Sequence, residues 1–597
     1  MRKLLWAALL FLLTAGLWAQ SAPPATDDAA QLRQEIDQLK KTVTALEQRL
    51  DAQEKPKPAE TAPTAAPVPA TAIADLQESV RDLNDRVMTT ERRSLKDRLD
   101  WGGDYRFEAH TIWGTVPNHY DGMQLQNLFV KTLFYVQTNN GNLPTQVDQI
   151  QSNVQTHYSD YQYFTNNLKF SDLKAAYSQF RQMPGFQQFM GMLMGAPGVY
   201  QTGYTNNTNA LLTNRLRLKF ETKVADNVSF GARLSMYKVF GDSTGVQVFN
   251  GQPNTLNIDG STVGVPNSDQ VRVERVFFNW NNIGGSKLYL SIGRRPAVGG
   301  PPLHYRDDEL RGGTPSGALF DFQYDGMTFG YHVTNKMTLR ACYGLGYSSG
   351  FGNGNLLKTP ADRLKDVHLA GGVLDLYETD HTFVQALFAR AWNVTDGFNG
   401  LIVLPNNPLT GDPVGAPVVM RFTPSANLGA IGLYGVVLQK KLANFDVFAS
   451  ANWDSLRPNG QTTPFGGLGS DPFDTPVNHE GHMFYLGARY SIPKDDGRTK
   501  IGFEFNQGSK YWFNFSNAED DIIAPKTNTR GEVYESYLTH RIADHFMFKA
   551  DFIRYNYTWS QSGWHIGAPK RLDSSPLLGF PGYDKANMFT LGLTAEF

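Results

Sequence analysis

The stretch Phe589-Thr590-Leu591-Gly592-Leu593-Thr594-Ala595-Glu596-Phe597 decides the fold class. Its odd-numbered side chains are apolar, and its even-numbered positions are polar or glycine. Because successive side chains of a β-strand point to opposite faces, this segment has one apolar and one polar face. In a membrane β-barrel, such a strand turns the apolar face to lipid and the polar face to the lumen.

The same alternation recurs upstream, wherever the chain after Asp100 leaves its turns and loops. The clearest segments are 212–224, 230–236, 339–346, 445–454, 484–491 and 500–506. The last strand also resembles the terminal signal by which outer-membrane barrels are recognised for assembly. We assign that signal to Phe589, Leu591, Leu593 and Phe597.

Short and long connections between these strands alternate without a break. The short ones are 225–227, 281–286, 334–336, 378–381, 440–444, 493–498 and 543–545. The long ones are 111–210, 241–270, 296–315, 348–365, 393–425, 455–480, 508–530 and 558–586. This asymmetry is typical of outer-membrane barrels, which have short periplasmic turns and long outer loops.

The strands therefore predict an all-β fold, a transmembrane antiparallel barrel of about sixteen strands over residues 99–597. A barrel of this size leaves room for an aqueous channel. Asp325-Gly326 matches a hairpin-turn signature inside the longest predicted strand, and a turn there would change the count.

The pattern of the segment before the barrel predicts an export signal followed by a stalk. Residues 1–19 carry Arg2 and Lys3 ahead of an apolar run, as a signal peptide does; a retained anchor is the alternative. Heptads at 20–55 and 73–98 predict coiled-coil segments, separated by a Pro- and Ala-rich linker at 56–72. The seam consists of Leu32, Ile36, Leu39, Val43, Leu46, Leu50, Ile73, Leu76, Val80, Leu83 and Val87. Two amphipathic helices lying on another surface would explain the same pattern.

Composition excludes several classes of protein. The mean hydropathy of −0.37 argues against a polytopic helical membrane protein. A net charge of −2 in 597 residues argues against nucleic-acid binding. The single cysteine, Cys342, excludes an internal disulfide, a cysteine zinc site and a C-x-x-C-H haem site. We expect no cofactor and no metal.

Charged residues on the polar faces are the candidates for lining a pore. The basic ones are Arg215, Arg217, Lys219, Arg233, Arg295, Arg340 and Arg489; the acidic ones are Asp104, Glu108, Asp321, Glu504 and Asp551. A basic ladder would favour anions, whereas pairing with the acidic residues would cancel that preference.

Two further features leave their roles open. The connection 111–210 contains two helical patterns and would form a plug in the lumen, a cap outside it or a partly ordered surface loop. Asp307-Asp308-Glu309 suggests either a calcium-binding loop or a solvated acidic loop. Gly346-Tyr347-Ser348-Ser349-Gly350 matches a hydrolase motif, but the helix that this motif requires does not follow it.

Five motifs resemble a family of bacterial outer-membrane barrels known only as a domain of unknown function. They are Leu99-Asp100-Trp101-Gly102-Gly103-Asp104-Tyr105-Arg106, Met236-Tyr237-Lys238, Ser291-Ile292-Gly293-Arg294-Arg295-Pro296, Gly300-Pro301-Pro302 and Arg311-Gly312-Gly313-Thr314-Pro315-Ser316-Gly317. The layout of stalk and barrel is also similar to that of phosphate-selective porins. The resemblance implies a porin-like barrel and carries no site residue.

These observations predict an outer-membrane porin without enzymatic activity, its stalk in the periplasm, that passes small hydrophilic solutes. Its expected partners are outer-membrane lipid, the barrel-assembly machinery and further copies of itself. A trimer is expected by analogy with porins, whereas Ile or Val at position a with Leu at d of the seam favours a dimer. One alternative is a scaffold or tether that links the membrane to peptidoglycan. Another is a barrel that encloses a separate electron-transfer partner, a cytochrome.

Overall fold

The computed structural model describes most of the chain beyond Asp100. The described residues are 41, 99–168, 170–241, 268–295, 297–350, 363–396, 400–403, 419–422, 424–463, 466–472, 474–516, 521–574, 576–579 and 582–597. The chain divides into two units, Met1–Asp100 and Trp101–Phe597. The predicted signal peptide, coiled-coil seam and linker therefore lie outside the described residues, apart from Lys41.

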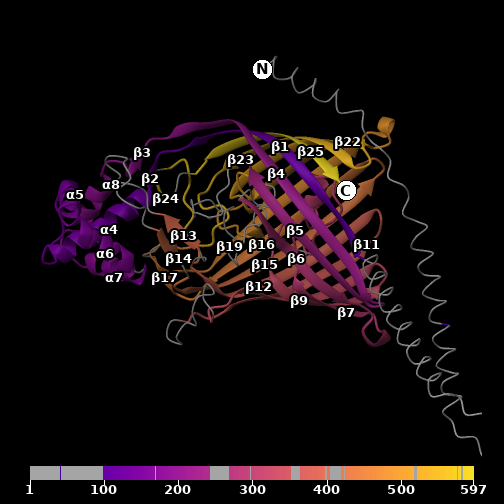
Figure 1. Ribbon diagram of the computed structural model, residues 1–597, viewed down its shortest axis with the longest axis horizontal. Helices are drawn as coiled ribbons and strands as arrows, with labels where there is room; N and C mark the ends of the chain where they lie inside the picture. The colour runs from indigo at the N-terminus through magenta and orange to yellow at the C-terminus, as the bar shows by residue number, and fades with distance from the viewer. Residues whose placement is uncertain are drawn as a thin grey trace, which may run out of the picture. The chain divides into compact units, whose positions relative to one another are not determined.

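A closed barrel of sixteen antiparallel strands dominates the second unit, as predicted (Figure 1). In chain order its strands are β1 (Leu99–Val116), β4 (Tyr204–Ala225), β5 (Val228–Val239), β6 (Ser268–Trp280), β7 (Leu288–Arg294), β9 (Asp325–Thr334), β10 (Met337–Tyr347), β11 (Val367–Glu378), β12 (Thr382–Thr395), β15 (Asn427–Leu442), β16 (Phe445–Pro458), β19 (His479–Ser491), β20 (Thr499–Gly508), β22 (Gly531–Ala543), β23 (Phe546–Tyr557) and β25 (Lys585–Glu596). Each strand pairs with its neighbour in sequence, and β1 and β25 close the ring.

Side chains alternate across the wall as their sequence pattern predicts. On β16, Phe445 and Trp453 are exposed on the outer face, whereas Ser450, Asn452 and Asp454 are buried toward the lumen. The exposed aromatic residues continue around the outside with Tyr343, Phe388, Tyr434, Phe484, Phe503 and Phe589. The exterior is therefore apolar and the lumen wall largely polar.

The last residue takes part in the closure between β1 and β25. The backbone N–H of Gly103 donates to the Phe597 carbonyl at 2.8 Å, and the Phe597 N–H donates back at 3.0 Å. A Cβ on Gly103 would lie 2.3 Å from the Arg217 carbonyl oxygen and 2.8 Å from the Phe597 ring. Only glycine fits at this position, which explains part of the 99–106 motif.

The strand predicted around Asp325-Gly326 was too long. These two residues begin β9 and form no hairpin turn, so the count of sixteen stands. Residues before Asp325 belong to the preceding connection, which contains the short strand β8 (Phe320–Asp321). The sequence placed Asp321 on the barrel wall, and that prediction was wrong. Asp321 is buried in a connection inside the barrel.

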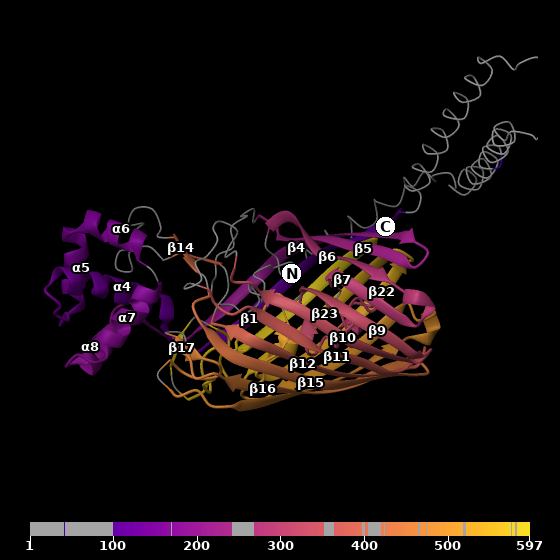
Figure 2. The same ribbon diagram turned by 90° about the horizontal axis from the view of Figure 1, so that it is seen from below.

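The long connection after β1 folds into helices with an apolar core of their own. They are α4 (Gly122–Thr138), α5 (Val147–Thr156), α6 (Tyr158–Asn167), α7 (Phe170–Phe180) and α8 (Phe186–Met194). Every buried member of their core lies between Leu125 and Val199, with no residue from the wall. In both views the helices lie beyond the rim of the barrel (Figures 1 and 2). Of the open alternatives, the plug in the lumen is therefore wrong.

Short elements complete the described fold. They are β2 (His119–Asp121), β3 (Tyr200–Gln201) and β24 (Leu577–Gly579), which form one small sheet, with β13 (Gly400–Val403), β14 (Val419–Phe422), β17 (Thr462–Thr463), β18 (Gly466–Gly467), β21 (Phe515–Ser516), η2 (Ile283–Gly285), η3 (Leu303–Tyr305), η5 (Pro493–Asp495) and η6 (Lys526–Asn528). None of the described helices combines the length and the apolar character that crossing a membrane would take.

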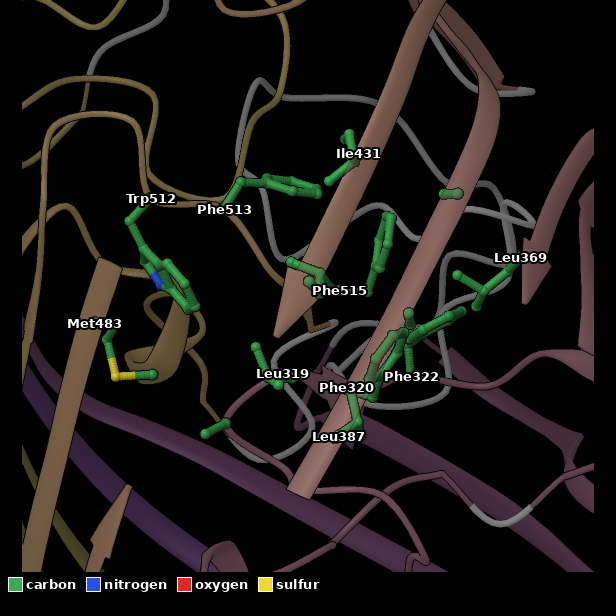
Figure 3. Packing of buried hydrophobic residues seen from close by; sticks show 14 of the residues in the cluster. Leu319, Phe320, Phe322, Leu369, Leu387, Ile431, Met483, Trp512, Phe513 and Phe515 are labelled. Carbon is green, nitrogen blue, oxygen red and sulfur yellow. The ribbon is translucent and has the colours of Figure 1, made fainter. Parts of the chain in front are cut away.

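A second apolar core lies inside the barrel, where the sequence predicted only polar side chains (Figure 3). Connections after β7 and β20 contribute Leu319, Phe320, Phe322, Trp512, Phe513 and Phe515 to it. Inward residues of β11, β12, β15 and β19 face them, among them Leu369, Leu387, Ile431 and Met483. Part of the lumen is therefore filled by packed side chains.

Candidate functional site

The connection between β7 and β9 folds into the lumen, and we call its residues 297–324 the lumen loop. Its two arms are joined by backbone hydrogen bonds. The N–H of Gly312 donates to the Gly299 carbonyl at 3.0 Å, and the N–H of Gly317 donates to the Pro301 carbonyl at 2.9 Å. The loop thereby forms a compact hairpin that carries residues 304–311 at its tip.

Glycines allow this close approach of the two arms. A Cβ at Gly300 would lie 1.9 Å from the Pro315 carbonyl oxygen. At Gly313 it would lie 2.9 Å from the Val298 carbonyl oxygen, and at Gly317 it would lie 2.6 Å from the Leu303 side chain. Any side chain at Gly300 would therefore displace backbone, so the Gly-rich motifs serve the packing of the loop.

Three consecutive carboxylates at the tip bind basic side chains of the barrel wall. Asp307 lies 2.7 Å from the Lys549 ammonium on β23. Asp308 lies 3.0 Å from the Arg489 guanidinium on β19. Asp308 also forms ion pairs with Lys500 on β20 and Arg541 on β22.

The third carboxylate reaches β4, the strand three places beyond β23 in the ring. Glu309 lies 2.6 Å from the Arg217 guanidinium and 3.3 Å from that of Arg215, both on β4. These two arginines also bind Asp104 on β1, at 2.6 and 3.2 Å. The prediction of a solvated acidic loop was therefore wrong, because the acidic tripeptide lies against five strands of the wall.

A second connection fills the lumen beside the first. Lys526, in the connection between β20 and β22, is buried and lies 2.6 Å from Glu504 on β20. It also forms an ion pair with Glu535 on β22. Arg306 of the lumen loop lies 2.5 Å from Asp521 in this connection, so the two connections are tied together by charge.

The other predicted pore-lining residues are also paired. Three arginines bind carboxylates on the wall: Arg233 binds Glu274, Arg340 lies 2.5 Å from Asp375, and Arg489 lies 2.8 Å from Asp446. Two carboxylates bind basic neighbours on their own strands: Glu108 lies 3.3 Å from Arg106, and Asp551 lies 3.2 Å from Lys549. Arg295 donates to the Ser291 hydroxyl. Lys219 is half exposed and lies 3.0 Å from Glu221, whereas Asp321 accepts from the Gly299 N–H at 2.8 Å. Most of the set is thus held in ion pairs, several of them with the tip of the lumen loop, and it forms no unpaired basic ladder.

A cavity of about 780 Å³ opens where the tip approaches the short connections. His304, Tyr305 and Arg311 of the lumen loop line it on one side, and the short connections after β11, β15 and β19 line it on the other. Burial, and then the charges of Arg489 and Arg311, lower the pKa of His304 to about 4. His304 is therefore neutral at pH 7, and the positive charge at this cavity comes from arginine and lysine.

Sequence reasoning named part of this network, such as Arg217, Arg489 and Asp104. It missed Lys500, Arg541 and Lys549, which bind the tip of the lumen loop. Glu274 and Asp375 lie on the same inward faces, so the alternation contained the signal for them. Asp307-Asp308-Glu309 lies in a connection that has no periodicity, and only the three-dimensional fold brings it to the wall.

The comparisons with known proteins give a family for this chain and no activity. The family described as "Protein of unknown function (DUF3373)" matches residues 205–597, which hold every barrel strand except β1 and the first residue of β4. No curated protein matches the chain.

Several solved outer-membrane proteins are similar over most of the chain. OprB of Pseudomonas putida is 10% identical with a TM-score of 0.38, covering 85% of this chain and 96% of that chain. OmpF of Salmonella typhi, solved with daunomycin, is 9% identical with a TM-score of 0.37, covering 84% and 97%. The outer-membrane channel DcaP of Acinetobacter baumannii is 10% identical with a TM-score of 0.35, also covering 84% and 97%.

Proposed function

We propose that this chain, which belongs to the DUF3373 family of proteins of unknown function, is an outer-membrane porin. In this proposal small hydrophilic solutes diffuse passively through the barrel, and the lumen loop sets the narrowest point. The observation that carries it is the closed barrel of sixteen strands with an apolar exterior and a charged lumen wall.

The exterior supports a place in the membrane. Phe388, Tyr434 and Trp453 are about half exposed on neighbouring strands, as expected of a surface that faces lipid rather than water. The stalk would then lie in the periplasm, and the trimer and the contact with the assembly machinery remain predictions.

The lumen supports selectivity by charge. The tip of the lumen loop lies against Arg489, Lys500 and Arg541, each close to the short-connection end of its strand. Because these cations are paired with Asp308, the basic side chains contribute less to anion attraction than an unpaired ladder would. Anion preference therefore depends on how far the negative charge of the tip carboxylates cancels the positive charge of the basic side chains on the wall.

Single-channel recording of the refolded mature chain in a planar bilayer tests the proposal. We expect stable open steps, and the reversal potential under a salt gradient gives the sign of the selectivity. A folded, heat-modifiable barrel that conducts no ions would refute the passive channel.

A scaffold is the second candidate, and the apolar core inside the barrel favours it. Leu319, Phe320 and Trp512 are buried against the wall in the way of a protein interior. A scaffold would be silent in the bilayer, and deletion of residues 36–87 would then weaken the attachment of the envelope. In a channel the same deletion would leave the conductance unchanged.

A further inference from the structure

Four side chains form a polar and aromatic group on the outer face of the barrel. They are Tyr343 on β10, His368 on β11, and Arg390 and Trp392 on β12. Their neighbours Leu369, Ala389 and Ala391 are buried toward the lumen, so the four project outward. All four lie within a few residues of the strand ends that meet the long connections.

The four side chains are held close together. The Tyr343 hydroxyl lies 2.8 Å from Nδ1 of His368, and their rings stack at 6.0 Å between centroids. Residues His368 and Trp392 are direct partners in the ladder between β11 and β12. The Arg390 guanidinium carbon lies 5.9 Å from the centroid of the Trp392 ring.

His368 and Arg390 are the two hydrogen-bond donors of this group that have no acidic partner in the described part of the chain. The 2.8 Å contact lets the Tyr343 hydroxyl donate to Nδ1, and in that tautomer the ring proton of His368 lies on Nε2, where it can donate to a ligand. In the described part of the chain, neither Arg390 nor His368 has a carboxylate within 4.0 Å. Arg457 on β16 contrasts with them, because its guanidinium lies 2.8 Å from Glu480.

A cation beside aromatic rings is suited to the level of the lipid headgroups. Aromatic residues form girdles at both interfaces of a membrane barrel, and basic side chains there attract anionic headgroups. Guanidinium and imidazole N–H groups form strong charge-assisted hydrogen bonds with phosphate oxygens. The pair Arg390 and His368 offers both kinds of donor on one face.

We propose that Arg390 and His368 bind the phosphate headgroup of a membrane lipid at the long-connection rim of the barrel. Tyr343 fixes the imidazole, and Trp392 packs beside the bound lipid. The proposal rests on the placement of the barrel in a membrane, which is part of the proposed function, but not on an open channel.

Native mass spectrometry of the full mature chain in detergent tests this site, with dioleoyl phosphatidic acid as the probe. We expect phosphatidic acid to remain bound preferentially over dioleoyl phosphatidylcholine. Arg390→Gln and His368→Gln should each lower its retention about fivefold or more. Equal retention of phosphatidic acid by wild type and both variants would overturn the proposal.

Arg457→Gln is the matched control, because it removes an outward arginine that already has a carboxylate partner. We expect it to retain the lipid as wild type does, and a loss equal to that of Arg390→Gln would also overturn the proposal. Heat-modifiability on gels checks that every variant is folded. A site for free phosphate would instead show displacement of the lipid by millimolar inorganic phosphate, and that result too would overturn the lipid assignment. Conductance of the same preparations reports on the channel separately.

Discussion

The connection after β1 and the lumen loop are both long connections of one barrel, yet they fold by opposite means. The first buries its own Leu128, Phe134 and Leu193 between helices. In the lumen loop, glycines let the two arms approach closely, and the carboxylates at the tip form ion pairs with the barrel wall. A connection with enough apolar residues makes its own core, whereas one rich in glycine, proline and charge takes its structure from the barrel.

The largest expected effect follows from exchanging the two connections for short linkers. Replacing residues 301–316 with a Gly-Ser linker should raise single-channel conductance severalfold, because the tip would no longer narrow the lumen. Replacing residues 122–196, which lie beyond the rim, should leave conductance within about twofold of wild type. Equal changes in conductance in the two variants would show that the lumen loop does not narrow the lumen more than the helical connection does.

Charge on the two connections should also act differently. The triple change Asp307→Asn, Asp308→Asn and Glu309→Gln leaves the wall cations without these partners, so the reversal potential should shift toward anion selectivity. The control is Asp148→Asn, Asp160→Asn and Asp172→Asn, which removes three exposed carboxylates from the helices. A shift of the same size in both proteins would show that position in the lumen does not matter.

Glycine substitutions should have opposite effects on stability in the two connections, a loss in the lumen loop and a gain in the helices. Gly300→Val forces a side chain into the Pro315 carbonyl, and we expect a loss of about 1–3 kcal/mol in the free energy of unfolding. Gly191→Ala in α8 meets no atom within 4 Å, and a helical alanine should gain about 0.5–1 kcal/mol. Urea titration with tryptophan fluorescence measures the first, and hydrogen exchange of α8 measures the second.

A pH-dependent effect on stability is expected for Lys131 in α4. Burial lowers the pKa of Lys131 to about 8, below its ordinary value of 10.5, so the folded helices disfavour the charged form. Because the unfolded chain then binds more protons between pH 8 and 10.5, the stability of the helices should rise across that window. Lys131→Met should remove this rise, as hydrogen exchange of α4 would report, whereas the barrel should show no such change. A rise that persists in Lys131→Met would contradict this assignment.

Most of the barrel could be predicted because its information is local. Alternation in segments such as 445–454 sets the faces of a strand, and the lengths of the connections set their order around the ring. The missing part of the site was not local. The partners of Asp308 lie on β19, β20 and β22, about 180 to 230 residues away along the chain.

The sequence by itself determined the strand pattern and the direction of the faces, since each depends on neighbours along the chain. Only the tertiary structure decided which connection enters the lumen. It also decided that the wall cations are paired, and that Leu319 and Phe320 pack inside a barrel whose wall looked polar. Those outcomes depend on the contacts that many separate strands make at once, and no periodicity records such contacts.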